Sequence, residues 1–599
     1  MKANVVQTLW SRVLVGTLRR AGVKHAVVSP GSRSTPFLAA LLDESEIRIH
    51  RVIDERSAAF VGLGLARASR QPVLLLCTSG TASANYFPAI IEADQSSIPL
   101  VVLTADRPVE AQFANSPQTT DQVRMYGAHV RRYVELGEAH GNVPALRAFQ
   151  RLVLSGVHLT QFPIPGPVHF NARARKPLEP AAPDSPEAQA LETQVNELLR
   201  QQPALPPLAP FSVHLRALRE FAEGSSSPRG LIVCGYDPQW PELDADALAE
   251  FSSETGYPVW IDVAHPLRWN LTPRLAARTL GCANLIWGGP NCTAEYTPDV
   301  LVQVGSIPTS SHFESWLENI GAKRHFLLTR QGWPDPTGRA ERVLMGDPSL
   351  TLRNAAGLVR DGGVGAERAQ SSWFLSCRRV NDLASAALEG FIRSESGTSE
   401  LRAVRSVLET CPAGTRVVLG NSLPIREADL VWPGAELAQY AFAIRGTNGI
   451  DGVVSTAVGV ALDGHAPVLL LLGDISFLHD IGGLYAARDV KSPLAIVVLD
   501  NQGGRIFEQL PIAASVDEPK FEHWTTPHSL NLKAAAGIYG IEVRSPTSTA
   551  VLEDDIRYAL LANKTTLIHV RVDPTSAKKG ESTLRAAVAA ALKSASTHG

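Results

Sequence analysis

The stretches Val468-Leu-Leu-Leu-Leu-Gly-Asp-Ile-Ser476 and Leu494-Ala-Ile-Val-Val-Leu-Asp-Asn-Gln-Gly-Gly504 decide the fold of this chain. Each is an apolar run of strand length that ends in a polar loop containing glycine. Continuous apolar strands separated by a helix-length segment are typical of a parallel sheet covered on both faces by helices. Because parallel strands end at the same edge of their sheet, we expect both loops at that edge, where such sheets bind ligands.

The same alternation of apolar runs and helical patterns recurs along the 599 residues, too many for a single core. We predict an α/β protein with three doubly wound parallel-sheet domains, at residues 1–185, 205–360 and 375–599. The proline-rich segments Lys176–Pro183 and Gln202–Pro210 lie between the first two domains and predict a linker that contains a helical stretch.

Composition indicates an ordinary globular enzyme, with 45% apolar residues, 19% charged residues and a net charge of -3. This charge does not favour nucleic acid as a partner, so arginine-rich loops are expected to meet small anions. No apolar run approaches the roughly 20 residues of a membrane span, and the N-terminus lacks a signal-peptide pattern, so we expect a cytoplasmic protein. The scattered cysteines predict buried thiols rather than disulfides or a zinc site: Cys77, Cys234, Cys282, Cys292, Cys377 and Cys411.

Asp474 and Asn501 follow the two strands quoted above and would offer one carboxylate oxygen and one amide oxygen at the same sheet edge. Nearby glycines allow a backbone carbonyl to approach as a further ligand. Hard oxygen ligands carrying little charge suit Mg²⁺, which completes its shell with water and phosphate. The alternative is that Asp474 only caps a helix, as aspartate often does; the paired Asn501 disfavours it.

This spacing resembles the Gly-Asp…Asn motif of the thiamin-diphosphate enzymes. Gly473-Asp-Ile-Ser-Phe-Leu-His-Asp480 is similar to the motif of the branch that joins a decarboxylated 2-oxo acid to isochorismate in menaquinone biosynthesis. Ile475 and Asp500 depart from the pattern of the broad superfamily, but Ile475 matches this branch. The resemblance implies thiamin diphosphate and Mg²⁺, with Mn²⁺ as an alternative, and the metal ligands Asp474, Asn501 and the carbonyl of Gly503. It also implies that the domains are pyrimidine-binding, central and diphosphate-binding.

The segment Asp54-Glu55 opens a helical pattern rich in small residues, Ser57–Ser69. Thiamin diphosphate needs a carboxylate against its aminopyrimidine ring before its C2 proton can leave. The resemblance gives this catalytic role to Glu55, whereas Asp54 suits a helix N-cap better. Gly62 and Gly64 lie inside the helical pattern and indicate close helix packing rather than a dinucleotide site.

Further site residues are implied by the resemblance. Arg445–Gly452 resembles the segment that carries the bulky residue beneath the bent cofactor, here Ile450. The implied cofactor contacts are Glu55, Ser422, Ile450, Gly473, Asp474, Ile475, Ser476, Asn501, Gly503 and Ile506. The implied substrate contacts are Ser32, Arg33, Arg107, Gln118, Asn421, Ser422, Arg426, Arg445, Ile506, Phe507 and Leu510. Arginine suits planar carboxylates, of which 2-oxoglutarate and isochorismate together carry four.

The central region matches the family less well. Ser311 and His312 stand where some members have a Lys-Arg pair, and we expect His312 at the surface. Contacts that the family assigns to that pair are therefore not carried over to this chain.

The resemblance implies a transferase that decarboxylates 2-oxoglutarate and adds the succinyl unit to isochorismate by 1,4-addition. The products would be CO₂ and 2-succinyl-5-enolpyruvyl-6-hydroxy-3-cyclohexene-1-carboxylate, and the expected assembly is a homodimer or dimer of dimers with shared active sites. One alternative is another carboligase or decarboxylase, such as acetohydroxyacid synthase; the arginines and the missing FAD signature disfavour it. The other is a non-catalytic protein that retains the fold, which the combination of Glu55, Asp474 and Asn501 disfavours.

Overall fold

The computed structural model describes residues 1–237, 242–288, 294–310, 312–319, 322–362, 368–395, 399–436 and 439–596. Contacts divide the chain into two compact units. Unit 1 comprises residues 1–208, 444–465 and 479–491, and unit 2 comprises residues 209–443, 466–478 and 492–599. Three parallel sheets with covering helices, one in unit 1 and two in unit 2, confirm the predicted fold class.

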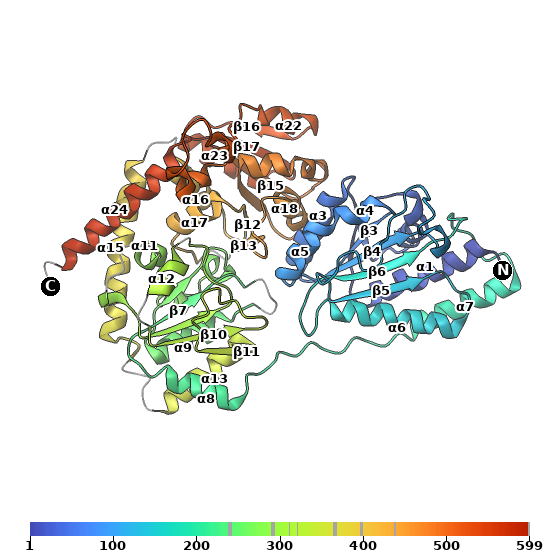
Figure 1. Ribbon diagram of the computed structural model, residues 1–599, viewed down its shortest axis with the longest axis horizontal. Coiled ribbons are helices and arrows are strands. Elements are labelled where there is room, and N and C mark those ends of the chain that lie inside the picture. The colour runs from blue at the N-terminus through green and yellow to red at the C-terminus, as the bar shows by residue number, and fades with distance from the viewer. Residues whose placement is uncertain are drawn as a thin grey trace. The chain divides into compact units, whose positions relative to one another are not determined.

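The sheet of unit 1 has six strands in the order β2-β1-β3-β4-β6-β5. Its strands are β1 (His25–Val28), β2 (Arg48–Arg51), β3 (Val73–Cys77), β4 (Leu100–Asp106), β5 (Arg132–Gly137) and β6 (Val168–Arg173). Strands β3 and β4 are buried along their whole length, which explains their continuous apolar sequences. Helices cover both faces of this sheet (Figure 1). A ligand can therefore reach the sheet only at the ends of its strands.

One face of this sheet packs against α1 (Ala3–Arg20), α2 (Thr35–Leu42), α6 (Val143–Leu159) and α7 (Pro186–Arg200). Helix α7 is the helix predicted between the two proline-rich segments, and the Ser185 side chain caps its N-terminus. The opposite face carries α3 (Glu55–Ser69) and α5 (Phe87–Gln95).

Two helices follow β3 in quick succession. They are α4 (Thr81–Asn85) and α5, which begins at Phe87. Pro88 lies in the first turn of α5, where its missing N–H costs no hydrogen bond. Pro88 therefore marks the start of α5, a boundary that the apolar periodicity of the sequence does not show.

Helix α3 packs closely against α18 (Val453–Leu462) within unit 1. A Cβ atom at Gly64 would lie 2.0 Å from the carbonyl oxygen of Thr456, and one at Gly459 would lie 2.1 Å from that of Val61. A Cβ atom at Gly62 would lie 2.3 Å from Leu75 Cδ2. The interpretation of Gly62 and Gly64 as packing residues is confirmed, because only glycine lets these surfaces approach.

The central sheet of unit 2 has five strands in the order β11-β10-β9-β7-β8. Its strands are β7 (Gly230–Cys234), β8 (Val259–Ile261), β9 (Val300–Val304), β10 (Arg324–Thr329) and β11 (Arg342–Met345). One face packs against α8 (Leu215–Gly224), α9 (Ala245–Thr255) and α13 (Pro348–Asp361). The other face packs against α11 (Ala283–Trp287), α12 (Phe313–Asn319) and α15 (Ser372–Ser394).

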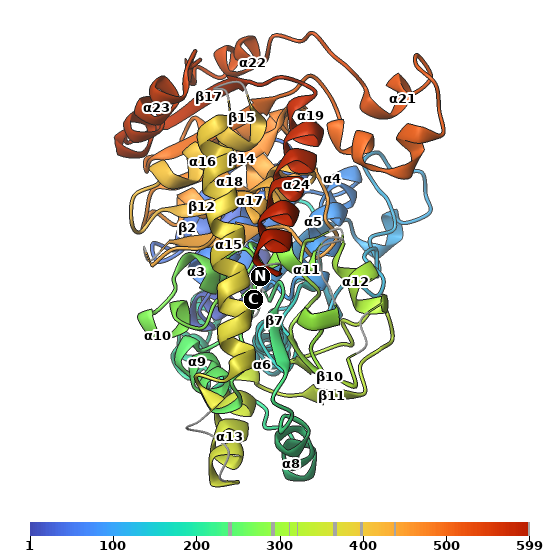
Figure 2. The same cartoon turned by 90° about the vertical axis from the view of Figure 1, so that its left-hand side faces the viewer.

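The third sheet, also in unit 2, has six strands in the order β13-β12-β14-β15-β17-β16. Its strands are β12 (Arg416–Leu419), β13 (Tyr440–Ala443), β14 (Val468–Gly473), β15 (Leu494–Asp500), β16 (Glu542–Arg544) and β17 (Thr565–Arg571). Its core joins that of the central sheet through α16 (Glu400–Thr410), α17 (Leu423–Val431), α23 (Thr549–Leu561) and α24 (Ser576–Ser596). Figure 2 shows α15 and α24 side by side, in agreement with their contacts.

The register of this sheet aligns the two loops quoted first. Gly473 of β14 pairs with Leu499 of β15, so Asp474 and Asp500 follow at the same sheet edge. The remaining short helices are α10 (Pro273–Ala276), α19 (Asp474–His479), α20 (Leu484–Ala487), α21 (Glu522–Thr525) and α22 (Leu532–Ile538).

Two expectations from composition concern burial. The described cysteines are buried free thiols, as predicted: Cys77, Cys234, Cys282, Cys377 and Cys411. Cys292 lies outside the described residues. Within the described ranges, we find no helix with both the length and the apolar composition of a membrane span.

Candidate cofactor and substrate site

Asp474 connects the loops after β14 and β15. It begins α19, and its side chain is only 2% exposed. Its Oδ1 accepts the Ile475 N–H at 2.7 Å and its Oδ2 accepts the Gly503 N–H at 2.9 Å. Burial raises the pKa of Asp474 to about 6, while these two backbone hydrogen bonds oppose the shift. Asp474 therefore does more than begin a helix, because it also fixes the loop that carries Asn501.

Asn501 presents a buried oxygen that lacks a partner. Its Nδ2 donates to both carboxylate oxygens of Glu400, at 3.0 and 3.2 Å. Its Oδ1 is buried and accepts no hydrogen bond within the described part of the chain. A buried polar atom without a partner is costly unless a ligand satisfies it. The amide oxygen thus has the chemistry of a metal ligand.

The two glycines of the motif differ in what surrounds them. A Cβ atom at Gly473 would meet no heavy atom within 4 Å, so the end of β14 borders open space. Gly503 has a φ of 143°, and a Cβ atom there would lie 2.4 Å from the Thr525 carbonyl oxygen. The Gly503 carbonyl accepts the Arg505 N–H at 2.9 Å, which leaves one lone pair for a cation. Carboxylate, free amide oxygen and carbonyl together fit Mg²⁺.

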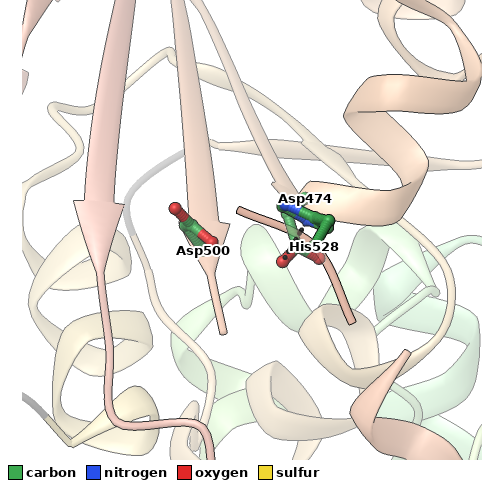
Figure 3. Close-up of side chains that lie close together, drawn as sticks. All are labelled: Asp474, Asp500 and His528. Atoms are coloured by element: carbon green, nitrogen blue, oxygen red, sulfur yellow. Dashed lines mark hydrogen bonds and ion pairs between the residues drawn. The ribbon is translucent and has the colours of Figure 1, made fainter. Parts of the chain in front are cut away.

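His528 and Asp500 complete a cluster at the same edge (Figure 3). Ligand atoms of Asp474, Asp500 and His528 all lie within 4.8 Å of one another. His528 Nε2 lies 3.2 Å from Asp474 Oδ2, and Asp500 Oδ2 lies 2.8 Å from His569 Nε2. The sequence analysis missed His528, because it lies in a loop beyond α21 and has no spacing relation to the motif.

The other residues predicted for unit 2 lie in neighbouring loops. Ile475 and Ser476 belong to α19, which follows β14. Asn421 and Ser422 follow β12, the strand beside β14, and Ser422 has a φ of 72° immediately before α17. Arg426 in α17 donates from Nη1 to the Ser422 carbonyl at 2.7 Å. This hydrogen bond ties an arginine predicted to bind substrate to the start of its own helix.

Ile506, Phe507 and Leu510 follow the loop that carries Asn501 and Gly503. The first two lie in the 3-10 helix Arg505–Gln509 and are half-buried, and Leu510 is 45% exposed. Apolar groups beside the polar strand ends provide the mixed lining that small-molecule sites use.

Glu55 is the first residue of α3 in unit 1 and is half-buried. The Asp54 side chain accepts the Arg56 N–H at 2.8 Å, which confirms Asp54 as the N-cap. Because Asp54 takes the capping role, the Glu55 carboxylate is not needed for it.

Arg33 and Arg107 lie in loops at one edge of the unit 1 sheet. Arg33 is 6% exposed, and its Nη1 donates to the Ala174 carbonyl at 2.5 Å. Burial lowers the pKa of Arg33, and the positive charge of Arg107 adds to this effect. Arg107 Nε is buried and lacks a hydrogen-bond partner among the described residues. A buried guanidinium nitrogen that lacks a partner among the described residues suits the binding of a carboxylate.

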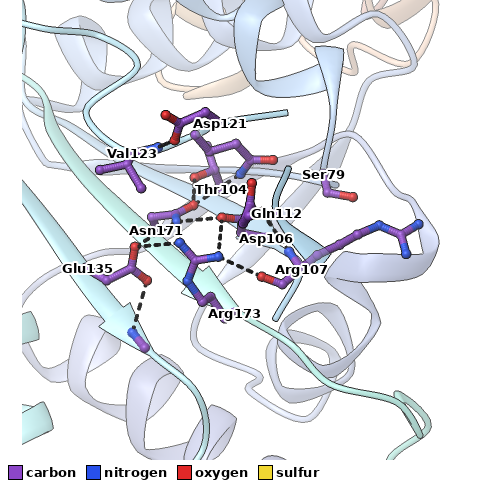
Figure 4. Close-up of polar contacts among 12 residues, drawn as sticks. Ser79, Thr104, Asp106, Arg107, Gln112, Asp121, Val123, Glu135, Asn171 and Arg173 are labelled. Carbon is purple, nitrogen blue, oxygen red and sulfur yellow. Dashed lines mark hydrogen bonds and ion pairs between the residues drawn. The ribbon is translucent and has the colours of Figure 1, made fainter. Parts of the chain in front are cut away.

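A buried polar network holds the loop that carries Arg107 (Figure 4). Asp106 accepts hydrogen bonds from Asn171 at 2.9 Å and from Gln112 at 3.2 Å, and it lies 3.1 Å from Arg173. Arg173 also donates to the Arg107 carbonyl at 2.8 Å. In Figure 4 the Arg107 side chain extends away from this network, so its guanidinium lies outside the network.

Gln118 is held against the loop after β3. Its Nε2 donates to the Ser79 carbonyl at 3.2 Å, and Ser79 Oγ donates to the Gln118 carbonyl at 3.0 Å. Gln118 has a φ of 54°, a left-handed conformation that these two bonds stabilise.

Arg445 and Ile450 belong to a segment of unit 1 that a buried carboxylate holds. Glu92, 2% exposed, accepts the N–H groups of Gly446 and Thr447 at 2.9 and 2.8 Å. The sequence analysis did not single out Glu92, which lies in an ordinary amphipathic helix.

His312, which was expected at the surface, is half-buried. Burial lowers its pKa, and the charge of Arg585 in α24 lowers it further. Arg585, which is distant from His312 in sequence, is thus near it in space. Ser311 lies outside the described residues.

The predicted site residues therefore fall into two groups. Unit 1 contains Ser32, Arg33, Glu55, Arg107, Gln118, Arg445 and Ile450. Unit 2 contains Asn421, Ser422, Arg426, Gly473, Asp474, Ile475, Ser476, Asn501, Gly503, Ile506, Phe507 and Leu510.

Comparison with known protein families gives two matches along this chain. Residues 10–125 match the thiamine pyrophosphate enzyme N-terminal TPP binding domain, and residues 439–570 match the corresponding C-terminal TPP binding domain. The chain is 35% identical over 582 residues to the 2-succinyl-5-enolpyruvyl-6-hydroxy-3-cyclohexene-1-carboxylate synthase of Sorangium cellulosum, covering 96% of this chain and 94% of that protein. It is also 35% identical over 596 residues to the synthase of the same name from Myxococcus xanthus, covering 98% of each chain.

Solved structures agree on the fold. Benzoylformate decarboxylase from Polynucleobacter necessarius superposes with a TM-score of 0.68 at 18% identity, covering 94% of this chain and 98% of that one. A putative thiamin diphosphate-dependent enzyme from Mycobacterium smegmatis superposes with a TM-score of 0.67 at 18% identity, covering 94% of this chain and 99% of that one.

Proposed function

This chain belongs to the 2-succinyl-5-enolpyruvyl-6-hydroxy-3-cyclohexene-1-carboxylate synthase family of thiamine pyrophosphate enzymes, and on that premise we propose its reaction and the roles of its residues. The reaction is decarboxylation of 2-oxoglutarate and 1,4-addition of the succinyl unit to isochorismate, with release of CO₂, in menaquinone biosynthesis. The observation that carries the cofactor assignment is the buried, unpartnered Asn501 Oδ1 beside the Asp474 carboxylate.

Asp474, Asn501 and the Gly503 carbonyl are the proposed ligands of Mg²⁺, or of Mn²⁺ in its place. These residues would hold the metal, and with it the cofactor diphosphate, and the open space at Gly473 would leave room for it. Thiamin diphosphate, when bound, supplies a nucleophilic carbon that permits decarboxylation of a 2-oxo acid and transfer of the remaining acyl unit.

Glu55 is the proposed catalytic residue of this chain. Its carboxylate accepts or returns a proton at the aminopyrimidine ring, and Asp54 leaves it free to do so by capping α3. Ile450 is the proposed apolar support of the cofactor, with Ser422, Ile475, Ser476 and Ile506 as further contacts.

The arginines are proposed to bind the substrate carboxylates. Arg33 and Arg107 are the strongest candidates, because Arg33 lies near Arg107 and the buried Arg107 Nε lacks a partner among the described residues. The other proposed substrate contacts are Ser32, Gln118, Asn421, Ser422, Arg426, Arg445, Ile506, Phe507 and Leu510. Apolar members of this set exclude water, while polar members orient the substrates.

The assembly is proposed to be a homodimer or dimer of dimers with shared active sites, and the protein is proposed to act in the cytoplasm. The assembly is implied by the family resemblance, and the location rests on the lack of an apolar run of membrane-spanning length in the sequence.

The test is an assay of purified protein with Mg²⁺, thiamin diphosphate, 2-oxoglutarate and isochorismate, following isochorismate absorbance and CO₂ release. The expected result is loss of isochorismate that requires every other component. Turnover of pyruvate in place of 2-oxoglutarate, with isochorismate unchanged, would instead favour an acetohydroxyacid synthase-like reaction. Cofactor binding without any turnover would favour a non-catalytic protein that retains the fold.

A further inference from the structure

Glu400, which is far from Asn501 in sequence, contacts its side chain. It is the first residue of α16 and is 0% exposed. Both of its carboxylate oxygens accept from the same atom, Asn501 Nδ2, at 3.0 and 3.2 Å. Both oxygens of this buried carboxylate thus bind the NH₂ side of the Asn501 amide.

The side-chain amide of asparagine has a hydrogen-bond donor, its NH₂ group, on one side and an acceptor, Oδ1, on the other. With Nδ2 against Glu400, the acceptor Oδ1 is free, as observed. If the amide turned by half a rotation, Oδ1 would face the Glu400 carboxylate, and in the ionised form of that carboxylate two acceptors would meet without a proton between them. The NH₂ group would then face the metal ligands, and it cannot coordinate a cation.

The position of Glu400 is well supported by its surroundings. Its backbone N–H donates to Ser576 Oγ at 3.1 Å, at the start of α24. Its side chain lies in the first turn of α16, where the helix dipole favours an acidic group. Helix α16 in turn packs against α17, α23 and α24. The carboxylate is therefore held rigidly enough to orient its neighbour.

We propose that Glu400 is a positioning residue that selects the orientation of the Asn501 amide in which Oδ1 faces the metal. This inference rests on the metal-binding role proposed for Asn501. It adds a residue of α16, far from the motif in sequence, to the determinants of metal affinity.

Mn²⁺ affinity of the full-length protein saturated with thiamin diphosphate tests the inference, with free Mn²⁺ counted by electron paramagnetic resonance. Glu400→Gln is nearly isosteric, but it accepts either orientation of the amide. The dissociation constant for Mn²⁺ is expected to rise by about tenfold, in the range found for groups that orient metal ligands.

A second background separates amide orientation from a general structural effect. Asn501→Asp has no amide to orient, so in that background Glu400→Gln is expected to change the Mn²⁺ dissociation constant much less than in the natural background. A purely structural role of Glu400 would weaken binding in both backgrounds.

Glu427→Gln is the matched control. Glu427 is 3% exposed on the adjacent helix α17, and neither of its carboxylate oxygens has a hydrogen-bond partner among the described residues. Burial holds the pKa of Glu427 well above its usual value, so the substitution changes a buried, uncharged carboxyl group, and the Mn²⁺ dissociation constant is expected to stay unchanged.

Four outcomes would overturn the inference. Glu400→Gln with unchanged affinity in the natural background, or with an equal loss of affinity in both backgrounds, removes the positioning role alone. An equal loss in Glu427→Gln assigns the effect to any buried carboxyl group. Failure of the unsubstituted protein to bind Mn²⁺ removes the metal role of Asn501 and, with it, the role of Glu400.

Discussion

Glu92 and Thr447 are joined at two points: Glu92 Oε2 accepts both the backbone N–H and the hydroxyl of Thr447, each at 2.8 Å. The other carboxylate oxygen accepts the Gly446 N–H at 2.9 Å and the Ser96 hydroxyl at 2.6 Å. Four hydrogen-bond donors thus satisfy this buried carboxylate. This arrangement fixes the turn directly after Arg445, a residue proposed to bind substrate.

Substitution of Glu92 is expected to loosen that turn. Glu92→Gln replaces one acceptor oxygen with an NH₂ group that faces N–H donors, so the free energy of unfolding should fall by about 1–3 kcal/mol. KM for the substrate bound by Arg445 should rise more than kcat falls. Urea unfolding and steady-state kinetics measure the two effects.

Ser96→Ala serves as the control for Glu92, because it removes only one of the four donors. It should cost less stability and leave KM unchanged. Equal kinetic parameters in Glu92→Gln and the natural protein would contradict a positioning role for Glu92.

Glu55→Gln should separate turnover from cofactor binding. The amide keeps the size of the side chain but cannot exchange a proton with the aminopyrimidine, so kcat should fall by about 100-fold or more. Thiamin diphosphate affinity, measured by calorimetry, should stay near that of the natural protein. Asp54→Asn is the neighbouring control, since asparagine also caps helices well. A comparable loss of kcat in Asp54→Asn would argue against Glu55 as the specific proton carrier.

Gly64→Ala should destabilise the packing of α3 on α18. The added Cβ atom would lie 2.0 Å from the Thr456 carbonyl, so the two helices must separate, at a cost of about 1–3 kcal/mol or more. Gly357→Ala in α13 is a matched helical control, because its Cβ atom would meet nothing within 4 Å. That substitution should stabilise the protein by about 0.5–1 kcal/mol. Thermal unfolding of both variants measures the contrast, and equal shifts would show that close approach at Gly64 is unimportant.

The buried carboxyl group of Asp480 makes the free energy of unfolding depend on pH, and the direction of that dependence follows from its pKa. Burial raises its pKa to about 6 from 3.8, although the N–H and hydroxyl of Ser455 donate to its carboxylate at 2.6 and 2.9 Å. Because the folded state holds this proton more tightly than the unfolded chain, stability contributed by Asp480 is present below pH 4. It is lost as the pH rises towards 6.

Asp480→Asn should remove this contribution. Urea unfolding of both proteins between pH 4 and pH 7 isolates it, because the other buried acids titrate equally in each. The difference in unfolding free energy should change by about 3 kcal/mol across that interval, at about 1.4 kcal/mol per pKa unit. A difference that stays constant with pH would contradict the raised pKa. Arg56 and Asp54, the charged groups near Asp480, are present in both proteins.

The sequence by itself determined the fold class and the position of the cofactor edge. Buried parallel strands need continuous apolar runs, so Val468–Leu472 and Leu494–Leu499 identified β14 and β15 directly. Asp474 and Asn501 follow these strands, and a parallel sheet necessarily brings them to one edge. Asp54 was identified as an N-cap for a similarly local reason, since capping involves only the next few residues.

Only the tertiary structure decided which residues support that edge. Glu400 reaches Asn501 from another helix, His528 reaches Asp474 from a distant loop, and Glu92 reaches Thr447 across most of the chain length. No periodicity or spacing marks these contacts, because they depend on how helices and loops pack rather than on neighbours in sequence. Strand-end ligands are local features of a sheet, whereas the carboxylates that orient them are placed by the packing of the whole unit.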